Sequence, residues 1–210
     1  KKILSSFVVV AFLLAGCAKN QVTGRSQLRL LPEKELQSMA TQQYQQFLSQ
    51  NKVVPVNVNK DAEMVRRVGT RIASAITQYL QKEGKGDLLD GYKWEFNLID
   101  NNEVNAWCMP GGKVVVYTGL LPVTQNEAAL AVVVGHEIAH ALVGHSAERM
   151  SVATATNVGV LVASYALGKD GRSRDLIYSL GGVATMALIS MPHSRYGETE
   201  ADEVGLRLAA

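Results

Sequence analysis

The sequence has few cysteines and little net charge. Cys17 and Cys108 are its two cysteines. Because Cys17 has the sequence context of a lipidation site, Cys108 has no partner for an intrachain disulfide. The formal net charge of +2 gives no electrostatic basis for nucleic-acid binding. With 47% hydrophobic residues, the composition is that of a globular protein whose core must supply the stability. We therefore expect no nucleic-acid partner, and no chemistry at Cys108, which lies in an apolar stretch.

The N-terminal residues have the pattern of a secretory signal. Two lysines precede an apolar run, Ile3 to Ala15, which is too short to span a membrane as a helix. The run ends in Leu14-Ala15-Gly16-Cys17, which resembles the bacterial lipobox, where the chain is cut before a lipidated cysteine. We expect residues 1–16 to be a signal peptide and Cys17 to carry a lipid anchor, the alternative being a plain signal peptide. The expected location is the outer membrane, facing the periplasm.

The remaining chain is expected to contain a tether and one domain. Residues 17–29 are polar and include Gly24, as in a flexible linker between membrane and domain. Residues 30–210 form the predicted catalytic domain. Apolar residues recur at helical spacing after Pro32 and again after Asp61, which predicts two amphipathic helices facing a core.

Strand patterns predict a small sheet among these helices. Trp94, Phe96 and Leu98 alternate with polar residues, which indicates a strand. A second strand is predicted over 113–117, after the turn signal Pro-Gly-Gly, and 105–109 can pair with it as a hairpin. The expected fold class is α+β and mostly helical.

A buried helix is predicted from Ala128 to Val143. Thr124 and Glu127 have the spacing of a capping box, so the helix is expected to start there. Its residues are apolar nearly all round, which is typical of a helix inside a domain. His136, Glu137 and His140 are therefore polar intrusions into a core element, and such intrusions are costly unless they serve a purpose.

The segment Gly135 to His140 contains the motif His-Glu-x-x-His. On a helix, residues four apart lie on one face, so His136 and His140 can bind one zinc ion per chain. Glu137 lies beside them and can act as a general base. The alternative is a pair of core histidines with other partners. His145 is five residues beyond His140, on another side of the helix, and is not expected to be a ligand.

Two further apolar segments, 152–167 and 176–191, flank a polar turn and predict a helical hairpin. Neither reaches the roughly 18 uninterrupted apolar residues of a membrane span. Packing in the core is the first expectation for this hairpin, and contact with a membrane surface or a partner is the alternative.

Several ordered motifs resemble one family of zinc metallopeptidases. They are Val22 to Arg25, Asn105-Ala106-Trp107, Pro110-Gly111-Gly112, Gly119-Leu120-Leu121, Gly135 to His140, Ser194-Arg195 and Glu198 to Asp202. The chain resembles the CAAX prenyl protease and heat-shock membrane protease family, and within it the lipoprotein branch of BepA-like and LoiP-like envelope proteases. The resemblance implies a gluzincin fold, with Glu198 as the third zinc ligand and Asn105 on the substrate side of the cleft, near an edge strand.

Helix geometry also favours Glu198 as that ligand. On a helix from about Ser194, Glu198 and Asp202 share a face with small residues that suit close packing. Glu200 falls on a charged face, the usual pattern of a solvated surface. Asp202 can then accept a hydrogen bond from a ligand histidine. The alternative for Glu198 is a simple pair with Arg195.

These residues predict a zinc-dependent metalloendopeptidase. Its expected partners are polypeptide substrates, in particular misfolded or unassembled envelope proteins, together with the membrane and possible envelope assembly machinery. The alternative is an envelope chaperone or assembly factor with a structural zinc site. Members of the family extend further, so we expect the chain to be part of a longer protein, with a transition-state-stabilising residue outside it.

Overall fold

The computed structural model describes residues 17–168, 170–185 and 191–209. The predicted signal peptide, 1–16, lies outside these residues. The chain divides into two compact units, which are described separately. The first comprises residues 1–31 and 145–198, and the second comprises residues 32–144 and 199–210.

The second unit is built on a three-stranded sheet with the order β3-β5-β4. Strand β3, Glu95–Ile99, runs parallel to the central strand β5, Lys113–Tyr117, and β4, Ala106–Met109, pairs with β5 antiparallel. The predicted hairpin is therefore confirmed, with Ala106 opposite Val116. Strands β3 and β4 form the two edges of the sheet.

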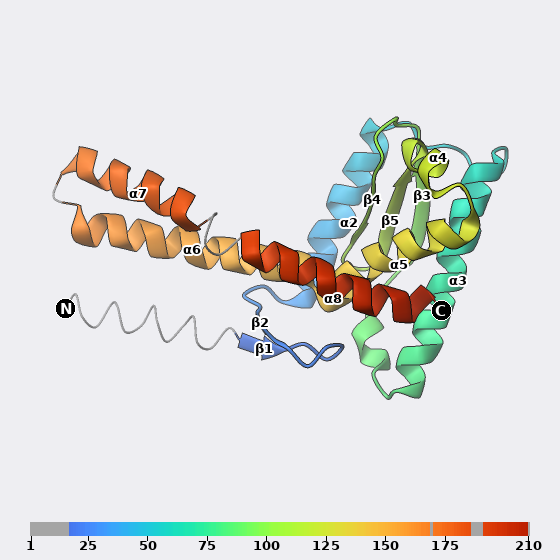
Figure 1. The fold of residues 1–210 in the computed structure, drawn as a ribbon, viewed down its shortest axis with the longest axis horizontal. Coiled ribbons are helices and arrows are strands. Elements are labelled where there is room, and N and C mark those ends of the chain that lie inside the picture. Colours follow the sequence, from blue (N-terminus) through green and yellow to red (C-terminus); the bar gives the residue numbers. More distant parts are fainter. Residues whose placement is uncertain (1–16, 169, 186–190, 210) are drawn as a thin grey trace. The chain divides into compact units, whose positions relative to one another are not determined.

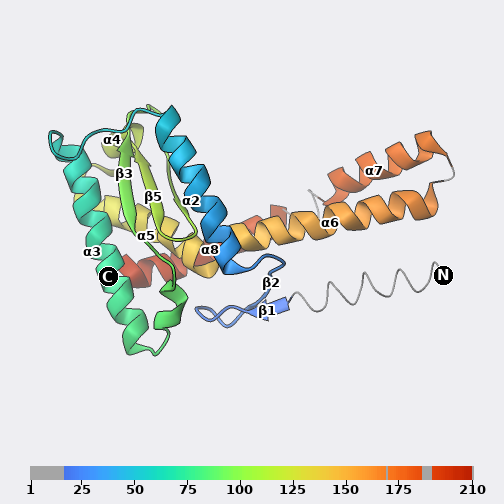
Figure 2. The same cartoon turned by 180° about the vertical axis from the view of Figure 1, so that it is seen from behind.

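Helices pack on both faces of this sheet (Figures 1 and 2). The helical elements of the unit are α2 Glu33–Gln50, α3 Lys60–Lys82, η1 Gly86–Leu89, η2 Thr118–Leu120, α4 Leu121–Thr124 and α5 Glu127–Val143. The helices predicted after Pro32 and Asp61 are thus confirmed as α2 and α3. The mostly helical α+β fold class is confirmed as well.

The alternation of side chains along β5 creates two apolar layers. Val114 and Val116 belong to the larger cluster, with residues of α3 and α5. Val115 and Tyr117 belong to the smaller cluster, with Tyr44 of α2. Because successive side chains of a strand point to opposite faces, the sheet separates α2 from α5.

Helix α5 starts two residues later than the capping box suggested. Asn126 is the N-cap, and its Oδ1 accepts a hydrogen bond from Ala129 N at 2.9 Å. Thr124 cannot take that role because it is the last residue of α4, where its hydroxyl donates to Leu121 O. The prediction of a Thr124 cap was therefore wrong. Gly144 ends the helix with a φ of 74°, a conformation that favours glycine.

The first unit contains a β-hairpin and two long helices. The hairpin consists of β1 Cys17–Lys19 and β2 Ser26–Leu28, and the helices are α6 His145–Leu167 and α7 Gly171–Thr185. Helix α8, Met191–Ala209, starts in this unit and continues into the second. The segment expected to be a flexible tether therefore has regular structure.

Buried polar contacts attach this β-hairpin to the first two turns of α6. Arg25 donates two hydrogen bonds to the carboxylate of Glu148, at 2.7 and 2.6 Å, and the Glu148 side chain is only 4% exposed. Leu30 N donates to Ser151 Oγ at 3.0 Å. Two parallel N–H···O bonds fix orientation as well as distance, so residues 17–30 have a defined position on α6.

The predicted helical hairpin exists, but it does not pack in a core. Helices α6 and α7 lie side by side (Figures 1 and 2). Many of their large apolar side chains are exposed: Val158, Leu161, Val162, Tyr165, Leu167, Leu176, Tyr178 and Leu180. Among the described residues of this unit, α6 packs mainly against α7 and β2, and the exposure of these side chains shows that the expectation of core packing was wrong.

Candidate metal centre

His136 and His140 lie one turn apart on α5, with their rings in an edge-to-face arrangement. Their Nε2 atoms are 3.0 Å apart, and the ring centroids are 4.6 Å apart. Two nitrogen ligands in a tetrahedral zinc site, each about 2.0–2.1 Å from the metal, are separated by about 3.3 Å. The pair therefore needs only a small adjustment to bind one zinc ion.

Asp202 of α8 orients the first of these histidines. Its Oδ1 lies 2.8 Å from Nδ1 of His136, so the Nδ1–H donates to the carboxylate. This contact fixes the ring orientation and leaves Nε2 as the unprotonated nitrogen. The backbones are close as well, because a Cβ on Gly205 would lie 2.9 Å from the Cα of His136. Glycine at this position allows α8 to approach α5.

Glu198 lies one helical turn before Asp202 on the same helix. Helix α8 is continuous through Glu198, so the contact of Asp202 with His136 also brings Glu198 to the histidine pair. Among the described residues, one ligand atom each from His136, His140 and Glu198 lie within 4.8 Å of one another. Two imidazoles and one carboxylate form a donor set that suits zinc with one open position. His145 is not part of this cluster.

The orientation of α8 differs in part from the prediction. Ala201 and Gly205 are buried as expected. Glu200 is also buried, with 8% exposure, whereas Glu198 and Asp202 are exposed. The assignment of Glu200 to a solvated face was therefore wrong. Since the buried face is centred on Ala201, the two carboxylates stand at its rim beside the histidines.

Glu137 is half-buried on α5, which packs against β4. Burial raises the pKa of the Cys108 thiol on β4, and the negative charge of Glu137 raises it further. Cys108 is buried, as the sequence predicted, and a buried thiol with a raised pKa is a poor nucleophile.

Asn105 is exposed and immediately precedes β4. Its carbonyl accepts a hydrogen bond from Tyr117 N at 3.0 Å. Because hydrogen-bonded pairs alternate in an antiparallel ladder, the backbone groups of Ala106 and Cys108 point away from β5, toward the outer edge. Asn105 thus lies at the start of an edge strand, and no strand among the described residues pairs with the far side of β4.

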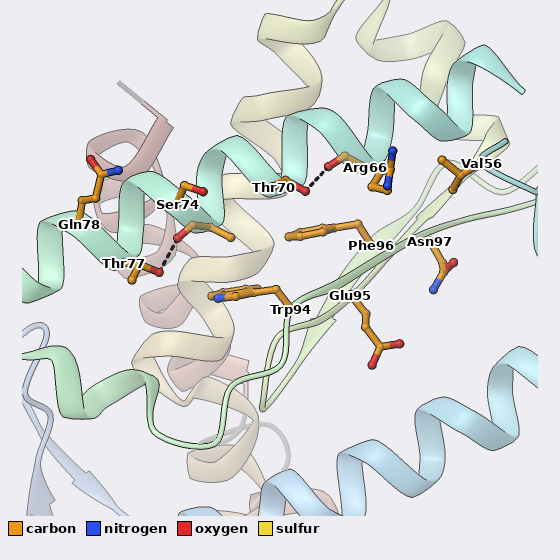
Figure 3. A pocket seen from close by; sticks show the side chains of 11 residues that line it. Val56, Arg66, Thr70, Ser74, Thr77, Gln78, Trp94, Glu95, Phe96 and Asn97 are labelled. Atoms are coloured by element: carbon orange, nitrogen blue, oxygen red, sulfur yellow. Dashed lines mark hydrogen bonds between the residues drawn. The ribbon is translucent and has the colours of Figure 1, made fainter.

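An open groove of about 650 Å³ lies at the other edge of the sheet, between α3 and β3 (Figure 3). Trp94 and Phe96 stack along it with parallel rings. Thr70 and Thr77 donate their hydroxyls to carbonyls of their own helix. Since β3 and β4 are opposite edges of the sheet, this groove is separate from the histidine pair.

Sequence reasoning missed the importance of Arg25 and Glu148. Arg25 was noted only as part of a motif, and Glu148 was not singled out. The signal that could have found Glu148 is its position: an acidic residue three residues after the buried His145, in the first turn of a helix that is uncharged from Val152 onward. Charged residues in such positions are rarely buried unless they are paired.

The family model described as "Peptidase family M48" matches residues 59–210. The chain belongs to peptidase family M48. This family prediction is confirmed, whereas the finer assignment to the CAAX prenyl protease, heat-shock or BepA-like branches stays a prediction. The matched region begins at the N-cap of α3 and includes both histidines, the sheet and α8.

Curated relatives include mitochondrial and bacterial proteins. The mitochondrial metalloendopeptidase OMA1 of Schizosaccharomyces pombe is 34% identical over 137 residues, which cover 65% of this chain and 37% of the relative. The mitochondrial metalloendopeptidase OMA1 of Bos taurus is 31% identical over 99% of this chain and 39% of its own length. The metalloprotease LoiP of Escherichia coli is 29% identical over 92% of this chain and 73% of its own length.

These matches have two consequences. The chain spans well under half the length of the mitochondrial relatives. The names of those relatives also overturn the predicted location: the similar metalloendopeptidases are mitochondrial, so the expectation of an exported, lipid-anchored outer-membrane protein was wrong. The N-terminal pattern misled because an apolar run followed by cysteine is a short signal, whereas the family match extends over most of the chain.

Proposed function

We propose that this chain forms the catalytic part of a zinc-dependent metalloendopeptidase. The observation that carries the proposal is the cluster of His136, His140 and Glu198, with Glu137 beside it. The relatives named as metalloendopeptidases support the same reaction class. Zinc bound by these residues would supply a Lewis acid that polarises the scissile carbonyl and lowers the pKa of water to about 7.

The residues of the chain have distinct roles in this proposal. His136, His140 and Glu198 hold the metal, and Asp202 keeps the His136 ring in the tautomer that leaves Nε2 free. Glu137 accepts a proton from the attacking water and returns it to the departing amine. Its half-buried position on α5, which packs against β4, leaves the carboxylate accessible to a substrate lying along β4.

We further propose that substrates bind as extended chains along β4. The outward backbone groups of Ala106 and Cys108 can form ladder hydrogen bonds with a peptide, and Asn105 at the start of the strand can contact the same peptide. Only a segment without stable secondary structure can pair in this way. Misfolded or unassembled proteins therefore fit the site better than folded ones.

The test is cleavage of casein, an unstructured polypeptide, by the zinc-loaded chain and by its Glu137→Gln variant. We expect the variant to lose at least about a hundredfold in kcat/KM, because the base is removed. Zinc content should stay at the parental value, because the ligands are intact. Glu203→Gln is the matched control, since Glu203 is an exposed carboxylate on α8, and it should keep full activity.

Further variants separate a catalytic metal site from a structural one. Glu198→Ala should lose both zinc and activity, and Asp202→Ala should weaken zinc binding by about 10–100-fold. Full activity in Glu137→Gln would refute the mechanism. Zinc binding with no cleavage of any polypeptide by the parental protein would favour the alternative of a chaperone with a structural metal.

A further inference from the structure

The outer edge of β3 borders the groove between α3 and β3. Glu95 N donates to Gly112 O at 2.9 Å, so the backbone groups of Glu95 and Asn97 face β5. Those of Trp94 and Phe96 point the other way, because the direction of these groups alternates along a strand. Among the described residues, none makes a backbone hydrogen bond with the outward groups of Phe96. This part of the edge can therefore pair with another strand.

A short segment of the chain already pairs with the other end of this edge. Val54 N donates to Leu98 O, and Asp100 N donates to Lys52 O, both at 2.9 Å. These bonds form a single antiparallel bridge, which the described chain does not continue toward Phe96. The edge thus accepts an extended segment through main-chain hydrogen bonds, and another polypeptide can extend the same ladder past Phe96.

Helix α3 forms the opposite wall of the groove. Trp94 and Phe96 point toward this helix, whereas Glu95 points away from it (Figure 3). The lining on α3 extends from Arg66 to Gln78, which is about 18 Å at 1.5 Å per residue. An extended chain rises about 3.3 Å per residue, so the groove has room for about five residues of a bound strand.

The two ends of the groove differ in chemical character (Figure 3). At one end, the Trp94 ring is only partly buried and offers an apolar contact. At the other end, Arg66 is exposed, and it makes no ion pair with any residue that the structure describes. Glu95, the acidic residue of the lining, accepts a hydrogen bond from Lys113 Nζ instead. The groove therefore has an uncompensated positive charge at its Arg66 end.

We propose that the α3–β3 groove is a docking site for an extended acidic segment of a partner polypeptide, which adds as a strand to the outer edge of β3. Peptides that add to a sheet edge gain affinity from main-chain hydrogen bonds and specificity from alternate side chains. On the face toward α3, an apolar side chain packs on Trp94, and an acidic side chain two residues away meets Arg66. The inference is independent of the proposed peptidase activity, because the histidines lie at the opposite edge of the sheet.

The test measures binding of a fluorescein-labelled heptapeptide, Leu-Thr-Glu-Thr-Leu-Thr-Glu, to the full chain by fluorescence anisotropy. Its leucines and glutamates alternate on one face in either chain direction. The protein carries Glu137→Gln, so that the peptide is not cleaved. We expect saturable binding. N-methylation of the leucine and glutamate amides removes the donors of an antiparallel addition, and N-methylation of the threonine amides removes those of a parallel one, so one of the two should abolish binding.

Two matched pairs of variants locate the peptide. Arg66→Gln should weaken binding about two- to fivefold, and replacing the glutamates of the peptide by glutamine should add no further loss. Lys34→Gln, the same charge change on the exposed face of α2, should have no effect. Ser74→Trp, which fills the groove, should weaken binding at least about tenfold. Ala75→Trp, the next exposed residue on α3 and outside the groove lining, should keep the affinity.

Hydrogen exchange gives a readout that is local to the edge strand. The bound peptide should slow amide exchange at Phe96, whose N–H it then bonds. Slower exchange on β4 instead, or equal affinity of Ser74→Trp and Ala75→Trp, would overturn the proposal, because the peptide would then lie outside the groove. Binding that survives both N-methylations would also refute strand addition. A dimer in peptide-free buffer that Ser74→Trp dissociates would show that a second copy of the chain occupies the groove instead.

Discussion

Helices α5 and α6 follow each other in the chain and are both rich in apolar residues, yet only α5 is buried. On α5, Leu130 and Ile138 are fully buried, because α3 and the sheet pack around them. On α6, Leu161 and Tyr165 are largely exposed. Apolar composition therefore indicates that a helix needs an apolar environment, without indicating whether protein or lipid supplies it. Four predictions test this difference, in order of decreasing effect.

The largest effect is expected where α6 is attached to its own unit. Arg25→Ala should lower the free energy of unfolding by about 3–5 kcal/mol, because it leaves the buried Glu148 carboxylate without its bidentate partner. Chemical denaturation measures the change. The double variant Arg25→Met with Glu148→Leu should recover most of the loss, since no buried charge remains.

The exposed ion pair Lys52–Asp100 provides the control for Arg25. Its nitrogen and oxygen are 2.6 Å apart, and the lysine side chain is 80% exposed. Lys52→Ala should leave stability unchanged within error. If Arg25→Ala is as harmless as Lys52→Ala, the β-hairpin of residues 17–30 is not fixed to α6.

A matched pair of leucines tests the comparison directly. Leu130→Ala on α5 should cost about 2–5 kcal/mol, because it removes buried methyl groups and leaves a cavity. Leu180→Ala on α7 should change the free energy of unfolding in detergent-free buffer by less than about 0.5 kcal/mol. Equal losses in the two variants would mean that the hairpin is covered in solution.

Much of this architecture followed from local patterns. The strand around Phe96 alternates with period two, and the strand around Val115 follows a Pro-Gly-Gly turn signal. The His136–His140 spacing defines one face of a helix, so these elements could be predicted. The cap of α5 was misassigned because Thr124 has the right spacing but is already used by α4. Local spacing does not show which residue is free to act as a cap.

The parts that could not be predicted depend on tertiary packing. Glu200 is buried because of which face of α8 packs inward. That face is shifted by one residue from the face that the small side chains predicted. The Arg25–Glu148 pair joins positions 123 residues apart, and no local pattern connects them. Glu198 was predicted from the family resemblance and from the small residues that share its helix face, and Asp202 from its place one turn after Glu198, which are again local relations.

The third prediction concerns a buried polar group beneath the sheet. Burial raises the pKa of Tyr44 to about 12, although Asn97 donates a hydrogen bond to its oxygen. Unfolded chains lose this proton near pH 10, so stability is constant below pH 10 and falls as the pH rises toward 12. The loss from this residue should reach about 2–3 kcal/mol.

Denaturation at a series of alkaline pH values measures this slope. Tyr44→Phe removes the ionisable hydroxyl, so its stability should fall less steeply than that of the parental protein between pH 10 and 12. Tyr44→Phe also loses the hydrogen bond with Asn97. A difference in the free energy of unfolding at pH 8 reports that loss and does not affect the slope. Identical slopes would mean that Tyr44 is accessible to solvent in the folded protein.

The smallest effect is expected from one methyl group at the contact between α8 and α5. A Cβ on Gly205 would lie 2.9 Å from the Cα and 3.0 Å from the nitrogen of His136. Backbone atoms cannot move aside as a flexible side chain can, so Gly205→Ala should cost about 1–3 kcal/mol. Displacing α8 also lengthens the Asp202–His136 contact, so zinc affinity, measured by competition with a chelating dye, should fall.

Gly182 on α7 provides the control from the exposed hairpin. A Cβ there has no heavy atom within 4 Å, so Gly182→Ala meets no steric barrier and gains helix propensity. It should be neutral or stabilise by up to about 1 kcal/mol, with unchanged zinc affinity. If Gly205→Ala behaves in the same way, α8 does not press against α5 at His136, and Asp202 and Glu198 lose the backbone contact that holds them beside the histidines.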